Sequence, residues 1–305
     1  MIAYTIRRIF LMLPLLLAIA TVTFFLMHAI QGGPFDQDKP LPPGTRIALE
    51  QRYGLAKPLE EQYVTYLKNL AHFDLGISIA TDRPVRDIIG ERFPISVQLG
   101  ICAFAFAMIG GLALGTIAAF NQNGIGDYIG VFVATAGSAL PGFILAPILV
   151  ITFVLRLHWF DVLGWEFGNY HKMVLPIVAF GMLPMALVAR ITRASMLDVL
   201  RQDYIRTARA KGLREVRVVV RHAAKNALIP VLTISGPVFA GLITGSFIIE
   251  RAFAIPGLGQ EFVSAVLVRD YGEIMGVTLF YAFIFAVMTL IVDLMYAVAD
   301  PRIRY

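Results

Sequence analysis

Long uncharged, apolar runs alternate with polar segments along the whole chain. The runs cover residues 9–30, 94–123, 128–155, 173–189, 226–249 and 274–292. A helix rises 1.5 Å per residue, so about 20 apolar residues cross the hydrocarbon core, and the fourth run reaches this length by continuing past Arg190. Within lipid, such runs satisfy their backbone amides as helices. The pattern therefore predicts an all-α integral membrane protein with six transmembrane helices.

The longest polar segment, residues 31–94, separates the first two runs. Within it, residues 46–53 and 59–71 show the spacing of short amphipathic helices. Its small size and low apolar content do not support an independent core, so we expect an ordered cap packed on the membrane part. The predicted parts are residues 1–30 with the first helix, the insertion at 31–94 and a core of five helices at 95–305.

Composition agrees with a membrane protein and indicates its orientation. Apolar residues make up 58% of the chain and charged residues 15%, and the mean hydropathy is +0.73. Soluble domains carry about 25% charged residues. With the N-terminus inside, more than half of the 26 Lys and Arg residues fall in segments 1–8, 121–127, 190–228 and 299–305. Because basic residues beside membrane helices stay inside, both termini are predicted to be cytoplasmic and the insertion extracytoplasmic.

Residue usage excludes several kinds of site. The single cysteine, Cys102, allows no internal disulfide, and the five histidines lack the spacing of metal ligands. None of the lysines follows a glycine, so the chain lacks the Gly-x-x-x-x-Gly-Lys-Ser/Thr loop that binds ATP phosphates. The net charge of +5 comes from residues beside membrane segments, which indicates topology and not nucleic-acid binding. We therefore predict a protein that is not an enzyme and has no cofactor, metal or nucleic-acid partner.

A basic segment at residues 190–228 holds ten Lys and Arg residues against three acids. Asp203 is placed to cap a helix N-terminus, and Gly212 has the C′ position at which left-handed backbone is common. In a second helical piece, an apolar face opposes a basic face; their members are Val216, Val219, Val220, Ala223 and Ala227 against Arg214, Arg217, Arg221 and Lys225. From charge alone two interpretations stay open, an amphipathic helix on anionic membrane lipid or a docking surface for a cytoplasmic partner.

The residues of the first helical piece favour docking. Residues 204–212 read YIRTARAKG, which resembles the cytoplasmic loop of ABC importer permeases in the form used by the peptide/nickel family. Ala208 and Gly212 match the second Ala and the Gly of the general pattern, whereas Arg206 and Thr207 replace its Glu and first Ala. In that family the loop holds a coupling helix that binds the ATP-hydrolysing subunit. The resemblance implies an ATPase-coupling interface made by Asp203, Tyr204, Thr207, Ala208, Ala210, Lys211 and Gly212.

A second string, ERAFAIPGLG at residues 250–259, is similar to a family signature after the fifth helix. Its Gly257 and Gly259 permit a backbone turn, so the predicted gate or structural turn comprises Glu250, Pro256, Gly257 and Gly259. Acids inside membrane spans are functional candidates, and Asp293 lies in the sixth predicted span, directly after the uncharged run at 274–292. For Asp293 we favour a structural ion pair with Arg190 or Arg193 over a role in transport.

Small residues recur at helical spacing in two runs. Gly111 and Gly115 lie in the second run, and Gly241 and Gly245 lie in the fifth. Both pairs predict close packing between helices. Prolines within the runs, Pro141 among them, make kinks plausible.

The resemblance covers nearly the whole chain and implies the bundle of a type I ABC importer permease in the inner membrane of a bacterium. The partners it implies are a homologous second permease, two cytoplasmic ABC ATPases and an extracytoplasmic substrate-binding protein. The expected function is ATP-driven import of short peptides by alternating access, and nickel or another small solute is the alternative within the family.

Two rivals come from other classes. A self-sufficient secondary transporter typically shows an internal repeat, broken half-helices or ionisable residues at mid-membrane, and the sequence has no convincing repeat and few charges near the centres of its runs. A scaffold or assembly factor facing lipid explains the hydrophobicity but not the string at residues 204–212.

Overall fold

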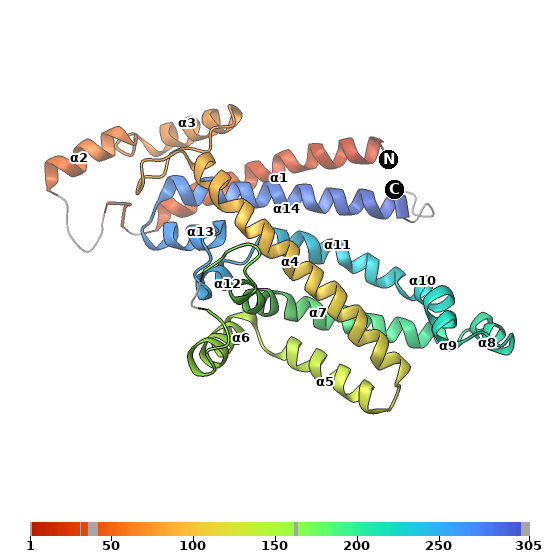
Figure 1. Ribbon diagram of the computed structural model, residues 1–305. Helices are drawn as coiled ribbons and strands as arrows, with labels where there is room; N and C mark the ends of the chain where they lie inside the picture. The colour runs from red at the N-terminus through yellow and green to blue at the C-terminus, as the bar shows by residue number, and fades with distance from the viewer. Residues whose placement is uncertain (1, 31, 36–41, 162–163, 300–305) are drawn as a thin grey trace. The chain divides into compact units, whose positions relative to one another are not determined.

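The computed structural model describes residues 2–30, 32–35, 42–161 and 164–299, and the regular elements of these residues are helices (Figure 1). Contacts divide the chain into two units. The terminal unit comprises the described parts of Met1–Ile95 and Pro256–Tyr305, and the central unit comprises those of Ser96–Ile255.

The terminal unit contains both end helices and the predicted insertion. Its elements are α1 (Ile2–Ala29), α2 (Pro43–Arg52), α3 (Leu59–Ala71), the start of α4 (Val85–Phe120), α13 (Leu258–Leu267) and α14 (Tyr271–Ala299). The central unit contains the rest of α4, α5 (Ile125–Ala139), α6 (Gly142–Leu149), the π-helix η1 (Val150–Arg156), α7 (Tyr170–Leu200), α8 (Asp203–Ala210), α9 (Glu215–Arg217), the π-helix η2 (Val218–Ala223), α10 (Ala224–Ala227), α11 (Ile229–Ile243) and α12 (Phe247–Ala252).

Four helices are long and apolar enough to cross a membrane. They are Thr5–Ala29, Val85–Phe120, Tyr170–Leu200 and Tyr271–Leu294. Two bent pairs pass the same test together, Ile125–Ala139 with Gly142–Arg156 and Arg221–Ala227 with Ile229–Ile243. The described residues therefore hold four to six spans by length and composition, and the predicted six is reached if each bent pair counts as one span.

The third apolar run is not the single helix that the sequence predicts. Helices Ile125–Ala139 and Gly142–Arg156 meet at an angle of 105°. Pro141 lacks an amide hydrogen and disfavours helical geometry at the residue before it, and Leu140 accordingly has extended backbone (φ −97°, ψ 109°). Hydropathy does not register such a break, because both halves are apolar.

The second and fifth runs also differ from their predicted limits. Helix α4 begins at Val85, ahead of the predicted start at residue 94, and continues through Pro94. In the fifth run, α11 ends at Ile243, and Gly245 then adopts a left-handed conformation (φ +79°) before α12 begins. Glycine occupies this conformation without a steric penalty, which explains the break inside an apolar stretch.

In the terminal unit, the insertion packs on the first membrane helix. Its α3 matches the predicted helix at residues 59–71, and α2 begins a few residues before the predicted 46–53. The ring of Phe24 on α1 contacts Tyr63 and Tyr66 of α3, and the Tyr63 hydroxyl lies 2.8 Å from Thr21 Oγ1. Helix α3 thus packs on α1, as expected of a cap; that these residues form an extracytoplasmic insertion stays a prediction.

A buried carboxylate connects the segment after α3 to the start of α14. Asp270 is 1% exposed and accepts hydrogen bonds from Ser78 Oγ (2.6 Å) and from the backbone amides of Ile79 (3.0 Å) and Ala80 (2.9 Å). It also accepts from the amide of Glu273 (3.0 Å), which caps the first turn of α14. One side chain thus joins parts of the sequence about 190 residues apart.

In the central unit, α4 packs closely against α7 through glycines. A Cβ atom at Gly111 would lie 2.6 Å from Val188 Cβ, and one at Gly115 would lie 2.5 Å from the Ala189 carbonyl oxygen. Real Cβ atoms do not come this close, so the glycines are required for the approach of the two helices. The packing prediction is confirmed for this pair.

Candidate functional site

Helix α8 follows α7 after a short turn and carries most of the resembling string (Figure 1). Lys211 is its C-cap, and Gly212 has φ +72° with its amide donating to the Arg209 carbonyl at 2.9 Å. The predicted C′ role of Gly212 is therefore confirmed. The predicted cap at Asp203 is wrong, because Gln202 has the N-cap position and Asp203 is the first helical residue. Its charge still faces the positive end of the helix dipole.

The inner side of α8 is anchored in the chain's own core. Ile205 is fully buried and Ala208 is 6% exposed. They belong to a cluster drawn from the end of α4, from α7 and from the helices after α8; its other buried members are Ala119, Met196, Val218, Val219, Ala223 and Ala227. Burial of a side chain the size of Ile205 stabilises by about 1.5–3 kcal/mol. This cluster holds α8 against the C-terminal end of α7.

The outer side of α8 is solvent-exposed. We call it the outer face and define it by eight exposed residues: Asp203, Tyr204, Arg206, Thr207, Arg209, Ala210, Lys211 and Gly212. Six of the seven residues predicted for the coupling interface belong to it. The exception is Ala208, for which the prediction is wrong: Ile205 and Ala208 are three residues apart and therefore share the inward side.

Polar contacts hold the outer face in place. Arg209 donates two hydrogen bonds to Glu215, from Nε at 3.1 Å and from Nη2 at 2.6 Å. These bonds hold the pKa of the Glu215 carboxyl below its usual value and raise the pKa of Arg209. Asn226 Nδ2 donates to the Tyr204 hydroxyl at 2.8 Å. Both pairs link α8 to later parts of the loop.

The second helical piece has the two faces that its sequence predicts. Val219, Ala223 and Ala227 are buried, and the basic residues are exposed: Arg214, Arg217, Arg221 and Lys225. The side chains of Val216 and Val220 lie outside the described residues. The exposed basic groups continue the positive charge of the outer face along the loop.

The predicted gate region divides between the two units. In the central unit, Glu250 lies in α12 and is fully buried, and the amide of Ile255 donates to its carbonyl at 2.8 Å. Left-handed backbone occurs at Gly245 (φ +79°) and Ala254 (φ +50°). Glu250 is thus enclosed between two reversals of the chain, whereas its part in a gate stays a prediction.

In the terminal unit, Pro256 precedes α13, Gly257 is the N-cap of α13, and Gly259 lies inside it. Gly257 has extended backbone (φ −90°, ψ 176°). Gly257 and Gly259 therefore do not adopt the left-handed backbone that was expected at this turn. The positive φ angles occur at Gly245 and Ala254.

Asp293 has an ionic partner that the sequence did not suggest, and its predicted pairing with Arg190 or Arg193, which lie in the other unit, stays a prediction. Within the terminal unit, Asp293 Oδ2 lies 2.7 Å from Arg8 Nη2, because α1 packs along α14. In the central unit, Arg193 donates to both carboxylate oxygens of Asp127, at 2.6 and 2.7 Å, and Arg190 donates to Ser138 Oγ at 3.1 Å. Each predicted member thus has a partner on a helix that neighbours it in the fold.

Sequence reasoning did not single out Asp127 or Asp270. Asp270 is followed three residues later by Glu273, directly before an apolar run, which is the acidic counterpart of a capping-box pattern and could have marked the start of α14. For Asp127, the sequence shows an acid just before the third run but does not indicate that Arg193 lies beside it.

Two family descriptions match the chain. The family "Binding-protein-dependent transport system inner membrane component" matches residues 111–305. The family for the N-terminal part of such membrane components matches residues 1–100.

Curated relatives match along their full length. The oligopeptide transport system permease protein OppB of Escherichia coli K12 is 43% identical over 306 residues, which is 100% of both chains. The dipeptide transport system permease protein DppB of Bacillus subtilis 168 is 45% identical over 302 residues, covering 99% of this chain and 97% of the relative. The DppB protein of Lactococcus lactis subsp. cremoris MG1363 is 39% identical over 305 residues and covers 100% of both.

Solved structures share the fold at low identity. The MetNI methionine ABC transporter in inward-facing conformations aligns with a TM-score of 0.58 and 14% identity, over 70% of this chain and 96% of the matched chain. An amino acid ABC transporter with histidines aligns with a TM-score of 0.52 and 16% identity, over 72% and 95%. The helical arrangement is thus that of transporter permeases.

Proposed function

The chain belongs to the family of inner membrane components of binding-protein-dependent transport systems, and from this we propose that it is the permease subunit of an ATP-driven importer of short peptides. The exposed basic outer face of α8, anchored through Ile205 to the core, is the observation that carries the proposal. A rigidly held surface transmits motion, whereas a helix resting on lipid does not need such an anchor.

The relatives support peptides over nickel as the solute. The relatives from Escherichia coli K12 and Bacillus subtilis 168, at 43% and 45% identity, are named for oligopeptide and dipeptide transport, and each matches nearly all of this chain.

The proposed assembly places the energy source outside this chain. Because its sequence lacks a phosphate-binding Gly-Lys motif, we assign ATP hydrolysis to two cytoplasmic ABC ATPases that bind the outer face. A homologous second permease and an extracytoplasmic binding protein complete the importer. Both termini and α8 are then cytoplasmic in the inner membrane, with α2 and α3 on the opposite side.

In the proposed mechanism, nucleotide binding draws the ATPases together and moves α8. The cluster around Ile205 passes this movement to α7, and the membrane helices open outward. ATP therefore shifts the population between inward-open and outward-open states without contacting this chain's membrane helices.

Uptake by the reconstituted importer tests this function. Proteoliposomes that contain this chain, its partner permease and both ATPases are expected to accumulate labelled Ala-Ala-Ala only with ATP and the binding protein present. A parallel assay with nickel is expected to show no accumulation. Because bent helix pairs also occur in secondary transporters, one arm applies ion gradients without ATP. Peptide accumulation in that arm contradicts the proposal.

A further inference from the structure

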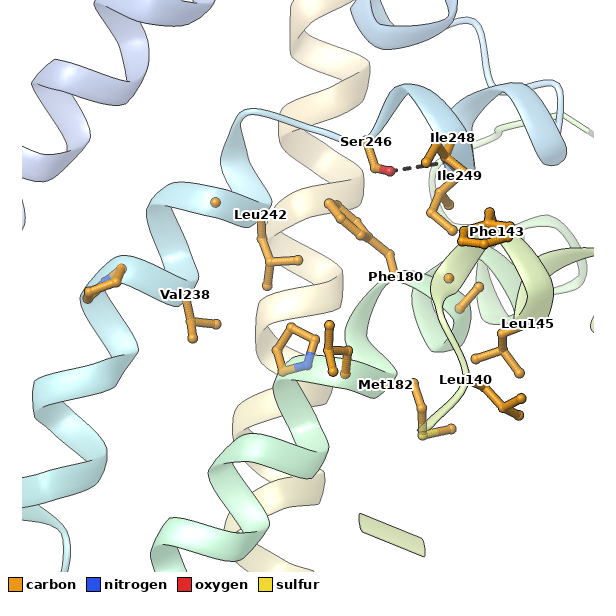
Figure 2. Close-up of a pocket in the computed structure, with 16 residues that line it drawn as sticks. Leu140, Phe143, Leu145, Phe180, Met182, Val238, Leu242, Ser246, Ile248 and Ile249 are labelled. Carbon is orange, nitrogen blue, oxygen red and sulfur yellow. Dashed lines mark hydrogen bonds between the residues drawn. The ribbon is translucent and has the colours of Figure 1, made fainter. Parts of the chain in front are cut away.

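A cavity of about 360 Å³ lies within the central unit, and we call it the apolar pocket. It is bounded by the junction of α5 and α6, by α7, by α11 and by α12. Figure 2 shows Phe143 of α6, Phe180 of α7 and Leu242 of α11 gathered around the same space. Its volume lies in the range of small-molecule sites, about 300–1,000 Å³.

The lining restricts the chemistry of an occupant. All 16 lining residues are uncharged, and Ser246 contributes the sole hydroxyl among them. Its Oγ accepts a hydrogen bond from the amide of Ile249 at 3.3 Å, as the dashed line in Figure 2 marks. The pocket thus offers no counter-charge for an amino or carboxylate group. The lining therefore fits an uncharged, apolar group.

Two helix interruptions of the central unit lie at this pocket. Leu140 and Gly142, on either side of the 105° bend at Pro141, line it, and so does Ser246, which follows the left-handed Gly245. Within a membrane, a helix is interrupted only where the non-helical backbone is buried in protein or lines a cavity. Discontinuous helices are also the elements that form solute sites in transporters. The breaks therefore favour a solute-binding cavity over a packing defect.

Gly241 keeps one wall of the pocket open. A Cβ atom built there meets nothing within 4 Å, in contrast to the closely packed Gly111 and Gly115. The predicted close packing is therefore absent at Gly241 within this chain. It holds at Gly245, where an added Cβ atom would lie 2.6 Å from Glu250 Oε1 and 3.2 Å from Ser96 Cβ of α4. Glycine inside a helix makes the helix less stable than alanine does. Gly241 therefore leaves the pocket unfilled while it lowers the stability of α11.

We propose that the apolar pocket binds apolar side chains of the transported peptide, of the size of Leu or Phe, while the peptide crosses the membrane. This inference rests on the proposed function as a peptide permease. It assigns to this chain a contribution to selectivity, in addition to that of the binding protein. Small side chains leave the pocket unfilled and gain little from it.

The test compares two peptides in proteoliposomes that hold the complete importer. Gly241→Leu fills the pocket without a clash in this chain and is expected to lower uptake of Ala-Phe-Ala at least about tenfold more than uptake of Ala-Ala-Ala. Gly241→Ala is expected to give a smaller shift in the same direction. Gly90→Leu is the matched control, because Gly90 is also an exposed helical glycine with nothing within 4 Å, outside the pocket. It is expected to leave the ratio unchanged.

Three outcomes overturn the inference. If Gly241→Leu lowers uptake of both peptides equally in a fully assembled importer, the pocket does not distinguish side chains. If the Gly241→Leu variant loses its partner permease during purification, a helix of that subunit occupies the apolar pocket. If the unaltered importer takes up neither peptide, the proposed function itself fails, and this separate result is read before any variant is compared.

Discussion

Ala210→Glu is expected to lower ATP-dependent peptide uptake more than tenfold while the chain still accumulates and folds in the membrane. Ala210 is exposed on the outer face, so its replacement disturbs no contact within the chain's own core. In a docked complex, however, an added carboxylate becomes an unpaired buried charge, which costs several kcal/mol. The measurement is uptake together with the amount of ATPase that copurifies.

Matched variants separate docking from folding. Ala208→Glu makes the same change two residues away, but its carboxylate enters the buried cluster around Ile205, so we expect less folded protein and a lower Tm. Ala56→Glu adds the charge at an exposed alanine of the insertion. It is expected to change neither peptide uptake nor the amount of ATPase that copurifies. Normal uptake and normal ATPase recovery with Ala210→Glu would remove the docking claim.

Asp270→Ala is expected to destabilise the chain by about 4 kcal/mol, the largest loss from a single side chain that we predict. The change leaves Ser78 Oγ and three backbone amides without their buried acceptor. For a protein of this size, the loss corresponds to a Tm lower by about 10 °C. Thermal unfolding of the purified chain in detergent measures it.

Asp74→Ala provides the control for this prediction. Asp74 accepts one backbone hydrogen bond, from the amide of Gly76 at 2.9 Å, and it is exposed. Its removal is expected to cost about 1 kcal/mol, the usual effect of losing one capping bond. Equal Tm shifts for the Asp74 and Asp270 variants would mean that the buried carboxylate does not join the two segments.

The sequence predicts where helices form better than where they stop. Apolar periodicity located α3 at its observed limits, because that helix lies between polar turns that hydropathy detects. Pro141 makes a kink plausible, but the sequence does not indicate a break of 105° there or any break at Gly245, since each lies inside an apolar run and depends on backbone geometry. Both breaks border the apolar pocket. The sequence therefore predicts the fold least well beside the proposed solute path.

Long-range pairs were the weakest predictions. For Asp293 the sequence suggests Arg190 or Arg193, whereas the partner found within the terminal unit, Arg8, lies at the other end of the sequence. A single sequence does not reveal which membrane helices are neighbours, and several arginines were available. Ala208 was misplaced for a simpler reason: Ile205, three residues earlier, already marks the buried side of α8, and a periodicity argument within this helix would have placed Ala208 beside it.

Site-directed cross-linking tests the central claim, that ATPases drive this chain through α8, most directly. Cys102 is the sole native cysteine, so Cys102→Ala gives a background for single thiols at Thr207 on the outer face and at Ile205 on the inner side. In the assembled importer, the Thr207→Cys thiol is expected to cross-link to an ATPase subunit, and the Ile205→Cys thiol is not. An active importer in which Thr207→Cys captures no ATPase, while a thiol elsewhere on the chain does, would contradict the account.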